Sequence, residues 1–172
     1  MFIKIENLTQ KEELTELFLK IEKDFGSVPP NFELLGNIDV YLLKDFLSNI
    51  SKIANHKTIN PNYFVFLRLF IANQENFKYC KLFNSLLLKN RGFSAEIIKK
   101  AKEDLSEIPF DEKHKLLAIK SLKAIFQSKI FNLSDFEELY KIGLTNKDIF
   151  DSIEHAGLIL KNGRILTAYS IK

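Results

Sequence analysis

Residues 63–72 form an apolar run, Tyr-Phe-Val-Phe-Leu-Arg-Leu-Phe-Ile-Ala, in which Arg68 is the single charged residue. A helix that is apolar nearly all round must be buried on most of its sides. The run therefore predicts a central helix that is surrounded by other elements. For Arg68 we expect a stem that packs against neighbours and a head that reaches water or a carboxylate; a clamp for a substrate anion is the alternative.

Apolar residues recur at spacings of three and four along most of the chain, as in Leu14, Leu17, Phe18 and Ile21. This period is typical of amphipathic helices, and the two-residue alternation of strands is scarce. The sequence therefore predicts an all-α protein. The expected helices cover residues 10–25, 37–55, 61–74, 75–91, 95–105, 111–129, 134–142 and 146–160, and a short helix follows Gly163.

Several polar pairs have the spacing at which side chains cap the first turn of a helix. The pairs are Thr9 with Glu12, Ser134 with Glu137 and, as a weaker version, Thr145 with Asp148. Gly92 and Gly143 each follow a periodic stretch, and we expect both to adopt the left-handed conformation that ends a helix.

The segment from Gly26 to Pro30 interrupts the helical pattern near the N-terminus. Two consecutive prolines cannot continue a helix, and they remove two amide donors. A chain of 172 residues falls in the usual size range of one domain. We therefore expect an N-terminal helical extension at residues 1–28 and one compact multi-helix domain at residues 29–172.

The 25 basic and 22 acidic residues give a formal net charge of +3 and are interleaved along the chain. The most basic stretch, residues 99–102, runs directly into Glu103 and Asp104, whereas a phosphate-binding surface needs sustained positive potential. We interpret this stretch as a solvated helix face and expect no nucleic-acid partner.

The sequence contains no run of about 18 apolar residues, so we expect no membrane-spanning helix. Residues Met1 to Lys4 lack the pattern of a signal peptide. Cys80 is the only cysteine, which excludes a disulfide within one chain and fits a reducing compartment. These features predict a cytoplasmic protein. We find no glycine-rich phosphate loop, nucleophile elbow or clustered Cys/His motif, and we expect no cofactor and no metal.

The cysteine lies in the segment 77–84, Phe-Lys-Tyr-Cys-Lys-Leu-Phe-Asn, which follows the apolar run. This segment resembles the alkylhydroperoxidase D-like, or carboxymuconolactone decarboxylase, family, in which a buried helix leads into a second helix with a Cys-x-Tyr-Cys motif and a histidine four residues later. Tyr79 and Cys80 match the centre of that motif. The resemblance extends over most of the chain and implies a compact multi-helix fold. The other matching segments are residues 30–59, 92–96, 110–124, 133–145 and 156–166.

The resemblance implies a chemistry in which a cysteine pair reduces hydroperoxides, one thiolate attacking the peroxide and the second thiol resolving the sulfenic acid. Here Cys80 matches the second cysteine, Phe77 stands at the position of the first, and Asn84 stands at that of the histidine. An asparagine can form hydrogen bonds but cannot titrate. In a gap-free count the helper glutamate of the family falls on Val65. We therefore do not expect the two-cysteine cycle or its proton relay in this chain.

An unassisted thiol has a pKa of about 8.5. Burial of Cys80 among aromatic neighbours would raise this pKa, whereas Lys78, Lys81 or a helix N-terminus could lower it. Glu75 is the nearest candidate base, although its five-residue separation from Cys80 places it on a different helix face. The histidines are distant in sequence, and we expect solvent-facing or structural roles for His56, His114 and His155.

Three functions stay open on these grounds. The first is a diverged alkylhydroperoxidase-like protein that has lost the two-cysteine cycle and acts as a non-catalytic module, either as a homo-oligomer or by binding a partner protein. The alternative is a single-cysteine thiol peroxidase with an antioxidant role, in which Cys80 becomes sulfenic acid and an external thiol reductant resolves it. The third is ligand binding without chemistry, in an apolar cavity beside Phe77 and Asn84.

Overall fold

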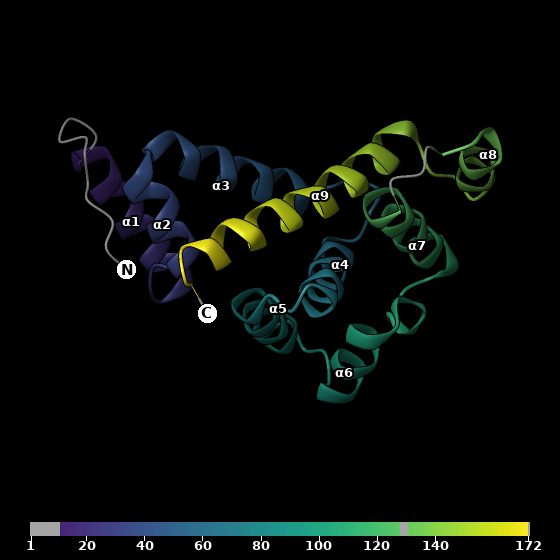
Figure 1. Cartoon of the computed structure of the whole chain (residues 1–172), viewed down its shortest axis with the longest axis horizontal. Helices are drawn as coiled ribbons and strands as arrows, with labels where there is room; N and C mark the ends of the chain where they lie inside the picture. Colours follow the sequence, from purple (N-terminus) through teal and green to yellow (C-terminus); the bar gives the residue numbers. More distant parts are fainter. Residues whose placement is uncertain (1–10, 128–130, 172) are drawn as a thin grey trace. The chain divides into compact units, whose positions relative to one another are not determined.

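The computed structural model of the chain describes residues 11–127 and 131–171 (Figure 1). In these residues every regular element is helical: nine α-helices, α1 to α9, and a short 3-10 helix, η2. This architecture confirms the predicted all-α fold class. The described residues form two compact units: unit 1 contains residues 11–54 and Ala168–Ile171, and unit 2 contains residues 55–127 and 131–167.

Unit 1 consists mainly of three helices, α1 (Lys11–Phe25), α2 (Pro30–Ile38) and α3 (Val40–Ala54). α1 and α2 approach closely at Gly36, where an added Cβ would lie 2.5 Å from the Leu14 side chain. Apolar side chains from all three helices fill the core of the unit: Leu14, Ile21, Phe32, Val40 and Leu43.

The helix α2 begins in the segment that the sequence pattern marked as an interruption. Pro30 is its first residue, a position that favours proline because the missing N–H would have no partner within the helix. Asp39 then separates α2 from α3 with extended backbone, and its Oδ1 accepts a hydrogen bond from Tyr41 N (2.9 Å). The helices predicted from periodicity therefore lacked α2 and started the next helix too early, at residue 37, whereas the family resemblance implied a pair of helices in residues 30–59, and α2 and α3 are that pair.

The segment that we expected as an extension, residues 1–28, contributes α1 to unit 1. The division between the units falls after Ala54, so α1 shares a unit with α2 and α3. The expected limits of the family-like domain, residues 29–172, stay a prediction, because a division by contacts does not test them.

Unit 2 contains the remaining helices. They are α4 (Pro61–Gln74), α5 (Lys78–Asn90), α6 (Ala95–Glu103), η2 (Leu105–Glu107), α7 (Glu112–Phe126), α8 (Leu133–Lys141) and α9 (Asn146–Ala168), whose last residue falls in unit 1. Within the part of the chain that the structure describes, none of these helices or those of unit 1 has the length and apolar content of a membrane span.

The apolar run forms the centre of unit 2, as the sequence predicted. α4 contacts α5, α6 and η2, and in Figure 1 it lies between α5, α6 and α7. The Phe66 ring meets the rings of Phe93 and Phe110 edge to face, with centroids 5.0 and 5.9 Å away. The α4 side chains that are at most 1% exposed are Tyr63, Phe64, Val65, Phe66, Leu67, Leu69, Ile71 and Ala72.

Two of the expected helix signals are present in the structure. Gly92 and Gly143 have φ angles of +87° and +81°, as expected for left-handed residues that follow helices. Before α9, Thr145 Oγ1 accepts from Asp148 N (3.2 Å), while Asp148 Oδ2 accepts from Thr145 N (2.8 Å). This reciprocal pair is the helix cap that the sequence predicted at Thr145 and Asp148, as a weaker version of a capping box.

The cap predicted at Ser134 with Glu137 is wrong. The capping box of α8 is formed by Asn132 and Asp135, because Asn132 Oδ1 accepts from Asp135 N (2.9 Å) and Asp135 Oδ2 accepts from Asn132 N (3.0 Å). Asparagine is at least as good an N-cap as serine, so the true helix start lies two residues earlier. The expected pair of Thr9 with Glu12 falls outside the described residues.

α9 continues through Gly163, where we had expected a break before a short terminal helix. A glycine inside a helix costs about 1 kcal/mol relative to alanine, which is not enough to end a helix that is packed along its length. The glycine is needed for packing, since an added Cβ would lie 2.2 Å from the ring of Phe77.

Candidate functional site

Cys80 lies in the first turn of α5 and is 6% exposed. Burial raises the pKa of its thiol to about 11, although the nearby Arg68 cation opposes the shift. A thiol with this pKa is ionised to on the order of 1 part in 10,000 at pH 7. The expected effect of burial is therefore present, and the opposing charge belongs to Arg68 of α4, not to Lys78 or Lys81.

Asn84, at the position of the family histidine, uses both ends of its amide. Its Nδ2 donates to the backbone oxygen of Cys80 (2.7 Å), and its Oδ1 accepts from Arg68 Nε (2.8 Å). The side chain is 2% exposed. Asn84 therefore connects α5 to α4 and places the Arg68 guanidinium close to the cysteine helix.

His155 of α9 completes this group from a third helix. Arg68 Nη1 and His155 Nε2 lie 3.1 Å apart. Because an arginine only donates, Nε2 accepts and carries no proton while the bond is formed. The ring is 3% exposed and meets Phe64 edge to face at a centroid distance of 5.3 Å. We call Arg68, Asn84 and His155 the Arg68 site.

Phe77 and Glu75 lie at the junction between α4 and α5. Phe77 is 7% exposed, and its ring packs on the backbone of Gly163 in α9. Glu75 caps the end of α4, and its carboxylate pairs with Arg164 Nη2 at 3.5 Å. The catalytic roles considered for Cys80, Phe77, Asn84 and Glu75 stay predictions.

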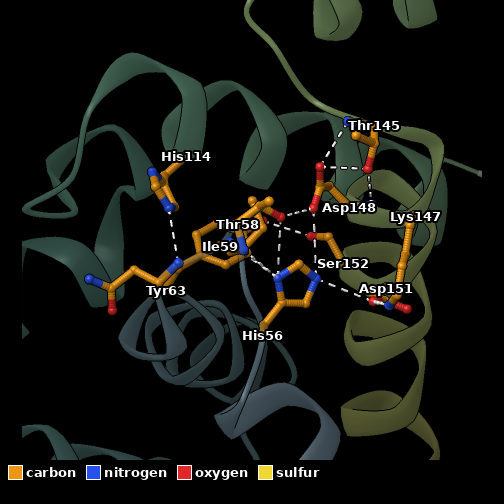
Figure 2. Close-up of polar contacts among 11 residues, drawn as sticks. His56, Thr58, Ile59, Tyr63, His114, Thr145, Lys147, Asp148, Asp151 and Ser152 are labelled. Atoms are coloured by element: carbon orange, nitrogen blue, oxygen red, sulfur yellow. Dashed lines mark hydrogen bonds and ion pairs between the residues drawn. The ribbon is translucent and has the colours of Figure 1, made fainter.

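Unit 2 contains a second polar group, which Figure 2 shows and which we call the His56 cluster: His56, Thr58, Asp148 and Asp151. The His56 side chain is 5% exposed, and its Nδ1 accepts from Ile59 N (3.1 Å). Nδ1 therefore carries no proton, and the hydrogen is on Nε2. Nε2 faces Asp151 Oδ2 at 3.2 Å and Asp148 Oδ1 at 3.8 Å (Figure 2).

The carboxylates of the His56 cluster have several partners each. Asp148 accepts from Thr58 Oγ1 and from both the amide and the hydroxyl of Thr145, the latter at 2.7 Å. Burial alone would raise the pKa of Asp148, but these hydrogen bonds hold it below its usual range. Asp151 also pairs with Lys147. The cluster thus joins the loop before α4 to the start of α9.

Further hydroxyl and imidazole contacts extend this arrangement. Tyr63 and Ser121 both meet Ser152 Oγ, each at 2.7 Å, and burial raises the pKa of Tyr63. His114 Nε2 accepts from Asn60 N (3.2 Å), while its Nδ1 contacts Asp111. These bonds tie α4 to α7 and α9, and they support the structural roles expected for the histidines.

Neither group resembles a metal centre. Among residues 11–127 and 131–171, no set of three or more His, Cys, Asp and Glu side chains is arranged to hold a metal ion. Sequence reasoning missed that Arg68 and His155 share a site, because 87 positions separate them. The charge of Arg68 within an apolar run was the one available signal.

No protein-family model matches the chain, and no curated protein is similar to it in sequence. Solved structures do match. A peroxidase-related protein from Silicibacter sp. TM1040 aligns with a TM-score of 0.85 and 14% identity over 100% of this chain and 90% of the other. An alkylhydroperoxidase AhpD core protein, described as peroxidase-related, from Ralstonia eutropha JMP134 aligns with a TM-score of 0.79 and 14% identity, over 96% and 87%.

A third similar structure is that of the debrominase Bmp8 in complex with 2,3,4-tribromopyrrole. It aligns with a TM-score of 0.72 and 15% identity over 100% of this chain and 91% of the other. At these identities the likeness concerns the fold. The chain, which has nine α-helices among its described residues, therefore has the fold of the alkylhydroperoxidase AhpD core, as the resemblance around Cys80 predicted.

Proposed function

We propose that this protein keeps the alkylhydroperoxidase-like fold without the two-cysteine peroxidase cycle and acts as a non-catalytic module that self-associates or binds a partner protein. The environment of Cys80 carries the proposal. Its thiol is buried, its pKa is raised to about 11, and it is the only cysteine in the sequence. The two-cysteine cycle needs a reactive thiolate and a second thiol in the chain, whereas here the thiolate fraction is small and the chain has no second cysteine.

The groups around Cys80 serve packing and hydrogen bonding. Phe77 fills the space beside Gly163, and the Asn84 amide bonds at one end to the backbone of Cys80 and at the other to Arg68. An amide cannot move a proton as a histidine can. These substitutions support a site that has become part of the scaffold.

An exposed apolar face on α5 supports self-association. Leu82 and Leu86 are 61% and 50% exposed, and one turn apart they share a face with the stacked rings of Tyr79 and Phe83, whose centroids are 5.9 Å apart. Clustered exposed apolar side chains are typical of interaction surfaces. A homo-oligomer formed through this face is the arrangement that we propose.

Light scattering after size-exclusion chromatography tests this arrangement. The wild-type chain should elute as an oligomer, and the double substitution Leu82→Glu with Leu86→Glu should shift it to the monomer. Lys99→Glu, an exposed charge reversal on α6 and so outside the α5 face, serves as the control and should leave the mass unchanged. A wild-type monomer at all concentrations would remove self-association from the proposal.

A single-cysteine thiol peroxidase is the second candidate, favoured by the Arg68 cation, which opposes the rise in the pKa of Cys80. The Cys80 thiolate would attack the peroxide, the O–O bond would break with release of an alcohol, and an external thiol would reduce the sulfenic acid. Trapping of sulfenic acid after hydroperoxide addition, with Cys80→Ser as control, decides between the two. Our first proposal predicts a rate no higher than that of a free thiol.

A further inference from the structure

The Arg68 guanidinium carries a positive charge that no carboxylate balances in the part of the chain that the structure describes. Its two hydrogen-bond partners, the Asn84 amide oxygen and His155 Nε2, are both neutral acceptors. A guanidinium has five N–H donors, and these two bonds leave the others without a protein acceptor among the described residues. Buried arginines usually meet a carboxylate or a phosphate, so this arrangement is incomplete.

The unused donors of Arg68 can be reached from solvent. Arg68 is partly exposed, and among the described residues the one fully buried side-chain nitrogen or oxygen without a hydrogen-bond partner is His56 Nε2. Arg68 Nη2, which has no hydrogen bond among the described residues, is therefore not sealed in the interior. A ligand that reaches them meets a fixed donor, because Asn84 and His155 hold the guanidinium from two sides.

The local potential at Arg68 is positive. Burial lowers the pKa of the Arg68 guanidinium to about 10, and Arg91 lowers it further through its own charge, so Arg68 stays protonated at neutral pH. Arg91 is exposed and donates to Asn62 Oδ1 (2.7 Å). An anion at Arg68 would relieve the repulsion between these two cations.

We propose that Arg68, held by Asn84 and His155, binds the carboxylate of a small organic acid beside Cys80. A carboxylate matches the planar guanidinium fork, and its negative charge offsets the charge of the guanidinium. The two groups that hold Arg68, the Asn84 amide and His155 Nε2, are neutral acceptors and do not compete for this role. This inference goes beyond the proposed function, since binding at Arg68 needs no chemistry at Cys80.

A purely structural Arg68 would use only the donors that already have partners. The two bonds to Asn84 and His155 would then account for the whole role of the guanidinium, and the desolvation of its charge would have no compensating interaction. Binding of an anion predicts an effect that the structural role does not, namely selective attraction of negatively charged reagents to this point of unit 2.

Alkylation of Cys80 measures this attraction in the wild-type chain, because no other cysteine reacts. Iodoacetate and iodoacetamide both transfer their CH₂ carbon to the thiolate sulfur with loss of iodide, but only iodoacetate carries a carboxylate. The measured quantity is the rate with iodoacetate divided by the rate with iodoacetamide, compared with the same quotient for a free thiol at the same pH and low salt. We expect the quotient for Cys80 to be about ten times that of the free thiol, a factor that corresponds to roughly 1.4 kcal/mol.

Three variants separate binding from folding. Arg68→Met should return the ratio to that of a free thiol, and Arg68→Lys, which keeps the charge without the fork, should give an intermediate ratio. Arg164→Met is the matched control on α9, where the arginine is 70% exposed and paired with Glu75, and it should leave the ratio unchanged. Circular dichroism confirms folding of each variant.

Competition identifies the class of anion with the wild-type chain alone. Acetate should protect Cys80 from iodoacetate in a saturable way, whereas sodium chloride of equal ionic strength should not. The proposal is overturned if the wild-type ratio is no higher than that of a free thiol, if Arg164→Met lowers it as much as Arg68→Met, or if inorganic phosphate protects and acetate does not.

Discussion

The Arg68 site and the His56 cluster lie in the same unit and both include residues of α9, yet they differ in how charge is balanced. In the His56 cluster, the carboxylate of Asp148 accepts from Thr58 and Thr145, and Asp151 pairs with Lys147 and faces His56. In the Arg68 site, the guanidinium has neutral acceptors and no carboxylate in the described part of the chain. The carboxylates of the His56 cluster are surrounded by donors, whereas the cation of the Arg68 site keeps N–H donors without a protein acceptor among the described residues.

This difference indicates which of the two groups serves stability. A buried carboxylate with full hydrogen bonding fixes the elements around it, and the loss of that carboxylate leaves several donors unsatisfied. A cation without a counter-ion contributes little to the free energy of folding, because no ion pair compensates the cost of its desolvation. We therefore expect substitutions in the His56 cluster to affect unfolding strongly, and substitutions in the Arg68 site to affect binding instead.

Asp148→Ala gives the largest expected effect. The change removes the acceptor for Thr58 and Thr145, and we expect a loss of about 2–4 kcal/mol in the free energy of unfolding in urea at pH 7. Glu137→Ala, an exposed carboxylate on α8, is the control and should stay within about 0.5 kcal/mol of wild type. If the two substitutions lowered the free energy of unfolding equally, the His56 cluster would be no more important for stability than an exposed carboxylate.

The stabilisation by Asp148 should depend on pH with a defined sign. Because the pKa of this carboxyl is lowered in the folded chain, its contribution is present above the unfolded pKa of about 3.9 and is lost as pH falls through the lower folded value. The difference between wild type and Asp148→Ala should shrink in that acid range. A difference that grew on acidification would contradict the assignment.

Cys80 should make the chain less stable at alkaline pH. An unfolded thiol ionises near pH ~8.5, whereas burial raises the folded pKa to about 11, so the folded state holds its proton over this window. Stability is full below the unfolded pKa and falls as pH rises toward 11, by roughly 3 kcal/mol in total. Urea unfolding of wild type and Cys80→Ala across pH 8 to 11 isolates this slope, which the variant should lack.

Gly163→Ala tests the packing of Phe77 beside Cys80. The new methyl group would lie 2.2 Å from the Phe77 ring, and we expect a loss of about 1–3 kcal/mol in stability. Gly157→Ala, in the same helix with nothing within 4 Å, should instead stabilise the chain by about 0.5–1 kcal/mol. Similar signs for the two substitutions, measured by urea unfolding, would show that Phe77 is not packed as described.

Arg68→Met should have the smallest effect on stability. Methionine keeps much of the apolar stem, and the loss of an unpaired charge partly offsets the two buried acceptors that the change leaves unsatisfied at Asn84 and His155, so we expect a loss of about 1–2 kcal/mol. The same urea series that measures Asp148→Ala provides the comparison. A loss as large as that of Asp148→Ala would assign Arg68 to the scaffold.

The sequence predicted those features that depend on local patterns. The apolar run predicted the buried helix α4, Gly92 and Gly143 predicted positive φ, and Thr145 with Asp148 predicted the start of α9. Each of these follows from residues that are close in the chain. The fold itself was predicted from the resemblance around Cys80.

The features that the sequence did not predict depend on packing or on competing local signals. α2 was missed because the two prolines also suit a helix start, and the cap of α8 was misplaced because Asn132 competes with Ser134. Gly163 lies inside α9 and does not end it; the residue is a glycine because the ring of Phe77 occupies the space that a side chain would need. The Arg68 site joins α4, α5 and α9, and no local pattern marks His155 as its third member.

A measured pKa of Cys80 would show whether the one thiol of this chain is held protonated, and so whether it can act as a peroxidase nucleophile. The pH dependence of Cys80 alkylation by iodoacetamide gives this pKa without interference, since the sequence has one cysteine. Because the thiol is buried, we expect a pKa of about 11. A pKa at or below that of a free thiol, about 8.5, would contradict it.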